Sequence, residues 1–187
     1  METYLGKEYS NFYFVSDLHL SHKNILKYDN RPFNSIEEHD QSIINNINST
    51  CEETSLLFIL GDVSMTSDMN YLRKLFKQIK CKVVLVKGNH DSHLKDCFLK
   101  ETFIDVKDYL ELKTKQAGKL ILSHYPFYSW NGSHRGNIHL YGHLHTTKLA
   151  LNGKSFNVGV CNSSTYSPFS LNQIISVTNK QLAGVHH

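Results

Sequence analysis

Side chains that can bind metal ions occur in five short blocks along this sequence of 187 residues. The last block, Gly142-His143-Leu144-His145, places two histidines around one leucine, and residues two apart in an extended segment point the same way. His143 and His145 could therefore direct two imidazoles, which are common metal ligands, at one point. Taken alone, the pair also fits an ordinary polar strand end. The other blocks are Asp17-Leu18-His19, Gly61-Asp62, Gly88-Asn89-His90-Asp91 and Ser123-His124.

Six short apolar runs, rich in β-branched and aromatic residues, predict buried strands. Five of them come directly before the five blocks, so each block stands at the carboxyl end of a strand. Open α/β sheets bind their ligands at that end. Glycine precedes the polar residues in three blocks, as a backbone that leaves its strand sharply would require. The predicted strands cover residues 11–15, 56–60, 83–86, 119–122, 137–140 and 155–158.

Three helices are predicted in the first half of the chain. Ser35 and Glu38 have the spacing of a capping box and precede an apolar face. A second apolar stripe runs over residues 69–79, and a short third helix is expected after Ser92. Alternating strands and helices predict parallel crossovers, while Asn152-Gly153 predicts a hairpin in the second half. The pattern indicates an α/β sandwich with one or two mixed sheets.

The five blocks together supply seven oxygen and nitrogen ligands and no thiolate. Seven are too many for one four-coordinate zinc ion, and they suit two octahedral-leaning ions bridged by one carboxylate. Such a pair clamps the entering and leaving oxygens of a phosphoryl displacement. His90 is left over, and a histidine beside a dinuclear centre suits a proton donor to the leaving oxygen. The seven predicted ligands are Asp17, His19, Asp62, Asn89, His124, His143 and His145.

The ordered set of blocks, which spans residues 17–145, resembles the calcineurin-like metallophosphoesterase family. The resemblance implies a four-layer α/β/β/α sandwich with two mixed sheets and the metals at the strand ends. It implies that Asp17, His19 and His145 bind the first metal and that Asp62 bridges. Asn89, His124 and His143 would bind the second metal. In such a site a metal-bridging hydroxide attacks phosphorus, and His90 would protonate the leaving alkoxide or steady the equatorial oxygens. Manganese is common in such sites, although iron, zinc, nickel or magnesium also occur.

Departures from the family's patterns narrow the subfamily. Protein serine/threonine phosphatases carry an Arg-Gly-Asn-His-Glu block, whereas this chain has Lys87-Gly88-Asn89-His90-Asp91. The chain is too short for the extra domain of the family's recombination-repair nucleases. The segments covering residues 17–25, 30–33 and 157–160 resemble the small single-domain phosphoesterases of bacteria and their phages. Those relatives often have aspartate where this chain has Cys161.

Four further residues are candidates for substrate binding. Arg31 lies in the first long loop and could bind phosphate through its guanidinium group; a solvated loop charge is the alternative. Residues 125–135 carry four aromatic side chains, which could stack on bases or could simply close a small hydrophobic cluster. Trp130, His134 and Arg135 are the candidates within that stretch. Asp91 either caps a helix or orients a neighbouring histidine.

The composition of the sequence indicates the number of domains, the cellular compartment and the state of the cysteines. Residues 1–187 are predicted to form a single domain, and 20 basic against 17 acidic residues give a net charge of +3. The four scattered cysteines suggest reduced thiols in a cytoplasmic protein. No signal pattern or membrane-spanning run is present. His186 and His187 are excluded from the interpretation, because they could be native residues or the remainder of an expression tag.

The prediction is therefore a metal-dependent phosphoesterase with two divalent ions, most consistent with Mn²⁺. It would hydrolyse a phosphomonoester or phosphodiester of a small substrate, a nucleotide or a nucleic-acid end. No membrane partner is expected, and the sequence predicts no particular oligomeric state. One alternative is a nuclease on polymeric nucleic acid, which should show a basic groove that a charge of +3 does not favour. The other is an inactive scaffold, which would typically have lost a ligand or the catalytic histidine.

Overall fold

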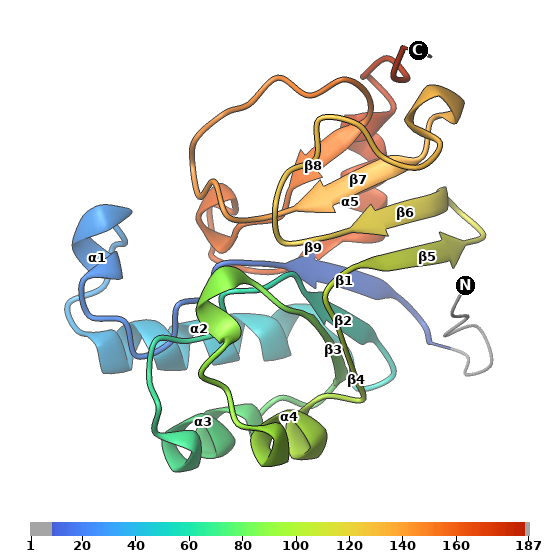
Figure 1. The fold of residues 1–187 in the computed structure, drawn as a ribbon. Helices are drawn as coiled ribbons and strands as arrows, with labels where there is room; N and C mark the ends of the chain where they lie inside the picture. The colour runs from blue at the N-terminus through green and yellow to red at the C-terminus, as the bar shows by residue number, and fades with distance from the viewer. Residues whose placement is uncertain (1–8, 186–187) are drawn as a thin grey trace.

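The computed structural model describes residues 9–185 and contains two β-sheets that pack face to face (Figure 1). The first sheet has the strand order β4-β3-β2-β1-β9. Strands β1 to β4 are parallel, and β9 pairs antiparallel with β1, so this sheet is mixed. Its strands are β1 (Phe12–Val15), β2 (Leu56–Ile59), β3 (Lys82–Val86), β4 (Asp105–Lys107) and β9 (Phe169–Ser170).

The second sheet has the order β5-β6-β7-β8 and is also mixed. Strands β6, β7 and β8 are parallel, and β5 pairs antiparallel with β6. Figure 1 shows β1, β6, β7 and β8 with their arrowheads toward the same side of the molecule. The strands are β5 (Leu110–Thr114), β6 (Gly118–Leu122), β7 (Ile138–Tyr141) and β8 (Ser155–Asn157).

The helices over residues 36–50, 69–76 and 96–102 cover the outer face of the first sheet, on the lower side in Figure 1, whereas the helix over residues 171–178 packs against β1, β8 and β9. Ser35 begins the longest of them by accepting the backbone N–H of Glu38, as the capping pattern predicts. The Glu38 carboxylate bonds Asn34 instead of Ser35, so the reciprocal half of the capping box is absent. The helices are α1 (Ile25–Tyr28), α2 (Ile36–Thr50), α3 (Met69–Phe76), α4 (Asp96–Thr102) and α5 (Leu171–Thr178).

One of two expectations about local structure was wrong. The short third helix follows Ser92 as expected and begins at Asp96, because a short 3₁₀ turn over Asn89–Asp91 first carries the chain away from β3. The Asn152-Gly153 pair does not form a hairpin. Strand β8 pairs parallel with β7, and Gly153 instead makes room for the ring of Trp130, which would meet a Cβ at 2.9 Å.

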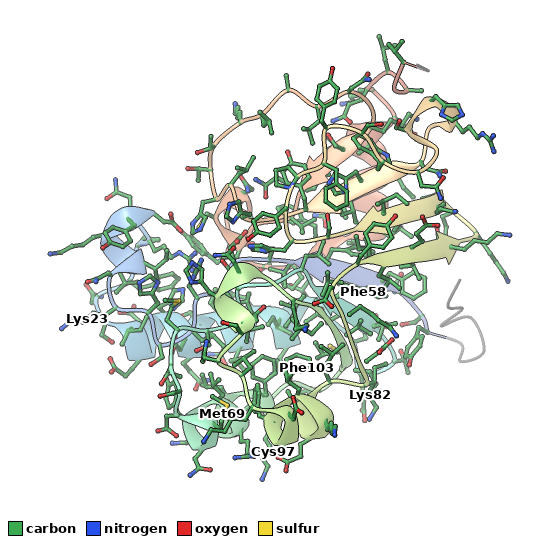
Figure 2. The ribbon with its side chains drawn as sticks, viewed as in Figure 1. Lys23, Phe58, Met69, Lys82, Cys97 and Phe103 are labelled. Atoms are coloured by element: carbon green, nitrogen blue, oxygen red, sulfur yellow. The ribbon has the colours of Figure 1, made fainter. Side chains whose placement is uncertain are left out.

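Two hydrophobic cores hold the layers together. One lies between the first sheet and helices α2, α3 and α4, and includes Phe103; the other lies between the two sheets and includes Phe58 (Figure 2). The outer face of the second sheet is covered by the loop over residues 123–137, where Trp130 and Phe127 contact the ring of His139. The predicted α/β sandwich with two mixed sheets is therefore confirmed.

All four cysteines are free thiols in the structure, as predicted. Within residues 9–185, no helix is both long and apolar enough to cross a membrane. His186 and His187 lie outside the described residues.

Candidate metal centre

All five predicted blocks meet at one edge of the molecule, because the strands that precede them end there. The first sheet contributes the segments that follow β1, β2 and β3, and the second sheet those that follow β6 and β7. The sheets are joined at this edge by a bridge in which Ser16 pairs with Gly159. Side chains from both sheets can therefore act on one ligand.

Asp17, His19 and His145 form one group of potential metal ligands. Their closest donor atoms all lie within 4.8 Å of one another. Nε2 of His19 is 3.3 Å from Nε2 of His145, a separation that suits two ligands each about 2.0–2.1 Å from a common ion. Burial lowers the pKa of His19, which favours the neutral imidazole that a metal ion requires. The structure therefore brings the three predicted ligands of the first metal together.

Asp62, His124 and His143 form a second group, whose donor atoms also lie within 4.8 Å of one another. Oδ1 of Asn89 is 3.0 Å from Nε2 of His124 and so belongs to the same cluster. All seven predicted ligands therefore lie in the two groups.

The Asp62 carboxylate lies between the two groups. Its Oδ2 atom is 3.7 Å from Nε2 of His19 and 3.5 Å from Nε2 of His124. Burial alone would raise the pKa of Asp62, but its hydrogen bond and charge interaction with His124 lower that pKa, so the side chain is a carboxylate at neutral pH. A bridging role for Asp62 agrees with this position.

Hydrogen bonds outside the two groups orient two of the imidazoles. Nδ1 of His124 donates to the carbonyl of Leu60 at 2.8 Å, and Nδ1 of His145 lies 2.7 Å from Oδ2 of Asp29. In each ring this contact turns Nε2 toward the centre and fixes the tautomer that leaves Nε2 able to bind a cation. The side-chain hydrogen bond to Asp29 raises the pKa of His145.

The backbone at the centre is strained. Eight described residues other than glycine have positive φ, a conformation that side chains rarely adopt. Five of the eight are predicted ligands, and such strain persists only where the surrounding structure enforces it. The five are Asp17 (φ 58°), His19 (51°), Asp62 (55°), His143 (67°) and His145 (49°).

Asp91 enforces part of this geometry. Its carboxylate accepts backbone N–H groups from Gly88 at 2.8 Å, Asp62 at 3.0 Å and Val63 at 2.8 Å. Asp91 is 1% exposed, so these donors have no access to water as a replacement. The capping role is confirmed in part, since the Asp91 carboxylate accepts the backbone N–H of Gly88 and so caps the 3₁₀ turn over Asn89–Asp91, although Asp91 is not the residue that begins a helix. It joins the segment after β2 to the segment after β3.

Arg31 is a structural residue, which corrects its prediction as a substrate ligand. The residue is 4% exposed, and its guanidinium group bonds inward in every direction. Nε and Nη2 both donate to the Asp29 carboxylate, and Nη2 also donates to the carbonyl of Asp17. Nη1 donates to the carbonyl of Leu18 and lies 2.8 Å from Nε2 of His39. No N–H group remains for a phosphate, but Arg31 holds the Asp17 backbone in place.

The sequence did not indicate a role for Asp29. Its carboxylate connects the hydrogen bonds around Arg31 to the candidate ligand His145. Its Oδ2 atom accepts from Arg31 at 2.9 Å and from the Cys161 thiol at 3.1 Å, and it contacts His145. Burial alone would raise the pKa of Asp29, but these hydrogen bonds lower it below the ordinary value. Burial also raises the pKa of Cys161 to about 12, so the thiol keeps its proton and can donate. No sequence motif marks Asp29, which lies in a loop 116 residues from His145.

The network continues from the metal centre into the helical layer. Nδ1 of His39 lies 2.8 Å from Oδ1 of Asp40, and Oδ2 of Asp40 accepts from the Tyr71 hydroxyl and the Ser21 backbone, both at 2.8 Å. His39 and Asp40 are fully buried. These side chains fix the loop that carries Arg31.

Trp130, His134 and Arg135 do not lie at the centre. Trp130 is 7% exposed, and its Nε1 atom donates to the carbonyl of Asn137. His134 and Arg135 belong to a short 3₁₀ helix that precedes β7, whereas the ligands follow that strand. These three residues are therefore at the amino end of β7, away from the candidate ligands, because the loop folds back over the outer face of the sheet.

Tyr125 is the aromatic residue of that loop that does lie at the centre. Its ring centroid is 4.6 Å from that of His143, and the side chain is 48% exposed. Its place directly after His124 is the sequence signal that could have identified it. His90 also lies where predicted, with Nε2 4.0 Å from Oδ2 of Asp62 and its side chain 43% exposed. It therefore reaches both the centre and the solvent.

The residues present fit two divalent ions. Two groups of nitrogen and oxygen donors converge, a buried carboxylate lies between them, and outside hydrogen bonds turn imidazole nitrogens inward.

A two-sheet sandwich with such a centre at its strand ends defines the metallophosphoesterase class. The sequence profile of the calcineurin-like phosphoesterases matches residues 10–159, and this chain belongs to that family. Members are hydrolases that act on phosphate esters, and the family generally binds two divalent metal ions.

Similar proteins extend over nearly the whole chain. The uncharacterized protein MJ1445 of Methanocaldococcus jannaschii is 31% identical over 90% of this chain and 91% of its own length. The gene 66 protein of Mycobacterium phage L5 is 24% identical over 81% of this chain and 86% of its own length. The crystal structure of AQ665, a protein of unknown function from Aquifex aeolicus, superposes with a TM-score of 0.70 and 25% identity, covering 89% of this chain and 98% of that one.

Proposed function

We propose that this protein is a dinuclear metal-dependent phosphoesterase that hydrolyses a phosphomonoester or phosphodiester of a nucleotide or a nucleic-acid end. The observation that carries the proposal is the position of Asp62, with one oxygen 3.7 Å from His19 and 3.5 Å from His124. One carboxylate shared by two groups of ligands is the arrangement expected of a two-ion centre.

Asp17, His19 and His145 would hold one ion, Asn89, His124 and His143 the other, and Asp62 would bridge them. We propose Mn²⁺ as the ion, since all seven ligands are oxygen or nitrogen atoms. Two divalent ions, when bound, supply activation of a water molecule and neutralisation of charge on the phosphate. Because the ligands come from both sheets, we also propose that residues 1–187 work as one domain.

His90 is the proposed proton donor to the leaving oxygen. Its imidazole is close enough to Asp62 to reach a phosphate bound at the centre, and no predicted ligand role uses it. A partly exposed imidazole can recover its proton from solvent after each turnover.

The test is a substrate screen with metal-reconstituted protein. Bis-p-nitrophenyl phosphate, p-nitrophenyl phosphate, cyclic nucleotides and dinucleotides would be compared in the presence of Mn²⁺, Mg²⁺, Zn²⁺, Ni²⁺ or Fe²⁺. Hydrolysis of at least one ester that disappears with a chelator and returns with Mn²⁺ is the expected result. Absence of hydrolysis with every ion and substrate would overturn the proposal.

A further inference from the structure

A cavity of about 490 Å³ opens directly beside the second group of ligands. Asn89 and His124, which belong to that group, form its inner wall, and it continues outward past Lys87, Tyr125 and Phe127. Its volume lies within the range of about 300–1,000 Å³ that is typical of small-molecule sites. A group held in this cavity would be attached to a phosphate bound at the metal centre.

Aromatic rings form one side of the cavity. The ring of Tyr125 contacts those of His124 and His143, and the side chain is 48% exposed, so part of it is accessible to a ligand. Phe127 is half-buried, and its ring centroid is 6.1 Å from that of Tyr109. Aromatic faces bind planar heterocycles by stacking, and they do so with any base. The wall thus suits a flat ring better than an alkyl chain.

His139 holds this aromatic wall in position. Its ring stacks on Phe127 with an interplanar angle of 6°, and its Nε2 atom accepts the Phe127 backbone N–H at 3.0 Å. Nδ1 donates to the carbonyl of Ile121 at 3.0 Å. Burial lowers the pKa of His139 to about 4, so at neutral pH Nε2 has the lone pair that this hydrogen bond requires. The wall is therefore formed before a ligand arrives.

Polar groups form the other side of the cavity. Nζ of Lys87 lies 3.0 Å from Oδ1 of Asp108, whose side chain is 85% exposed. Ser92, which is exposed, also lines the cavity. A cation, an anion and a hydroxyl group at one rim can meet the donors and acceptors of a base edge or a sugar. An unsubstituted aryl or alkyl group would leave them without partners.

We propose that this cavity is a nucleoside subsite, in which Tyr125 and Phe127 stack on the base of the group esterified to the scissile phosphate while Lys87 and Asp108 bind its polar edge. The inference rests on the proposed phosphoesterase activity and specifies its substrate class as nucleotide esters. Simple alkyl phosphates would react at the same centre without this additional binding.

The kinetic test compares two diesters with the same leaving group, thymidine 5′-p-nitrophenyl phosphate and methyl p-nitrophenyl phosphate. We expect the parent protein to prefer the nucleoside diester in kcat/KM by at least tenfold. Tyr125→Ala should reduce the ratio of kcat/KM on the nucleoside diester to kcat/KM on the methyl diester by about tenfold. Tyr125→Phe, which keeps the ring, should retain the preference. Tyr128→Ala is the matched control, because Tyr128 lies in the same loop, is 68% exposed and does not line the cavity.

A binding measurement provides a readout that does not depend on turnover. Isothermal titration calorimetry with the Mn²⁺-loaded protein would compare thymidine 5′-monophosphate with methyl phosphate. The nucleotide should bind at least tenfold more tightly, and Tyr125→Ala should remove that advantage, whereas Tyr128→Ala should retain it. If the parent hydrolyses both diesters equally or binds both ligands equally, the nucleoside subsite is wrong but the phosphoesterase activity stands. If the parent hydrolyses no ester in the substrate screen and binds neither ligand, both proposals fail.

Discussion

Asp29 and His145 are 116 residues apart in the chain, yet their side chains meet at 2.7 Å. The same carboxylate also binds the guanidinium group of Arg31, which is anchored to the backbone of Asp17. One contact therefore connects a predicted ligand on the second sheet to a predicted ligand on the first. Carboxylate–imidazole pairs of this kind orient a ligand and increase its basicity.

Replacing Asp29 should weaken metal binding without removing a ligand. Asp29→Asn is expected to lower Mn²⁺ affinity by about 10–100-fold, because His145 loses the carboxylate that orients it. Equilibrium dialysis against Mn²⁺ measures the effect. Cys161→Ala is the control and should stay within about threefold of the parent, since Asp29 keeps its contacts with Arg31 and His145. Unchanged affinity in Asp29→Asn would contradict the prediction.

His90→Ala should retain its metal ions but lose most of its turnover. Removing a general acid typically costs about 10²–10⁴-fold in rate. The measurements are kcat with p-nitrophenyl phosphate and the metal content of the same sample. His134→Ala provides the control, because His134 lies at the other end of β7 and should leave kcat unchanged. Equal turnover in His90→Ala and the parent would remove His90 from the mechanism.

Asp91→Ala should destabilise the fold more than most single substitutions of a polar residue do. The change leaves three backbone N–H groups without their acceptor in a buried site, and each such loss costs about 1–3 kcal/mol. Urea denaturation should give a free energy of unfolding lower by about 3 kcal/mol or more. Asp96→Ala, at an exposed position in the first turn of α4, should change it by less than about 1 kcal/mol. A similar effect of the two substitutions would show that Asp91 does not have this role.

Glycine should be more stable than alanine at His143 in metal-free protein. His143 has φ of 67°, which costs an alanine but not a glycine about 1 kcal/mol. Thermal denaturation of His143→Gly and His143→Ala in the presence of a chelator measures the difference. The opposite order is expected at Lys74, which is exposed within α3, where alanine should exceed glycine by about 1 kcal/mol. The same order at both positions would mean that the backbone at His143 relaxes once the imidazole is removed.

Glu111 should stabilise the fold in a pH-dependent way. Hydrogen bonds from Lys119, Asn131 and Tyr109 lower its pKa from the ordinary value of 4.5 to about 2. A carboxyl group with a lowered pKa in the folded state stabilises fully above pH 4.5, and this contribution is lost as the pH falls toward 2. The free energy of unfolding should therefore differ more between Glu111→Gln and the parent at pH 7 than at pH 3. A difference that is independent of pH would contradict this assignment.

Six strands and the clustering of the candidate ligands could be predicted because both depend on local pattern. Each of the six predicted apolar runs is a strand in the structure, and the polar residues that follow five of them lie together, since parallel strands end at a common edge. Strands β4 and β9 could not be predicted in this way, because short half-buried strands have no continuous apolar run. Strand β5 was also missed, because its buried residues alternate with polar ones. Helix α5 carries a capping box at Ser170 and Gln173 that was overlooked.

The substrate residues could not be predicted because burial decides their role. Arg31 and Trp130 have the side chains of phosphate and base ligands, but the fold uses both in its interior. Whether a guanidinium group faces solvent depends on its carbonyl and carboxylate partners, and those of Arg31 lie up to 14 residues away in sequence. Tyr125 differs from the other rings of its loop only because it adjoins His124.

Gly61 and Gly88 lie so close together that a Cβ on Gly61 would be 2.6 Å from the backbone of Gly88. The loop over residues 125–137, by contrast, leaves the rim and folds over the outer face of the second sheet. Tyr125 at the start of this loop and Lys87 and Asp108 outside it are at least partly exposed, so their side chains can vary without disturbing the contact between the two glycines. Substitutions at these three positions should therefore change which esters bind while the backbone that carries the candidate metal ligands stays the same.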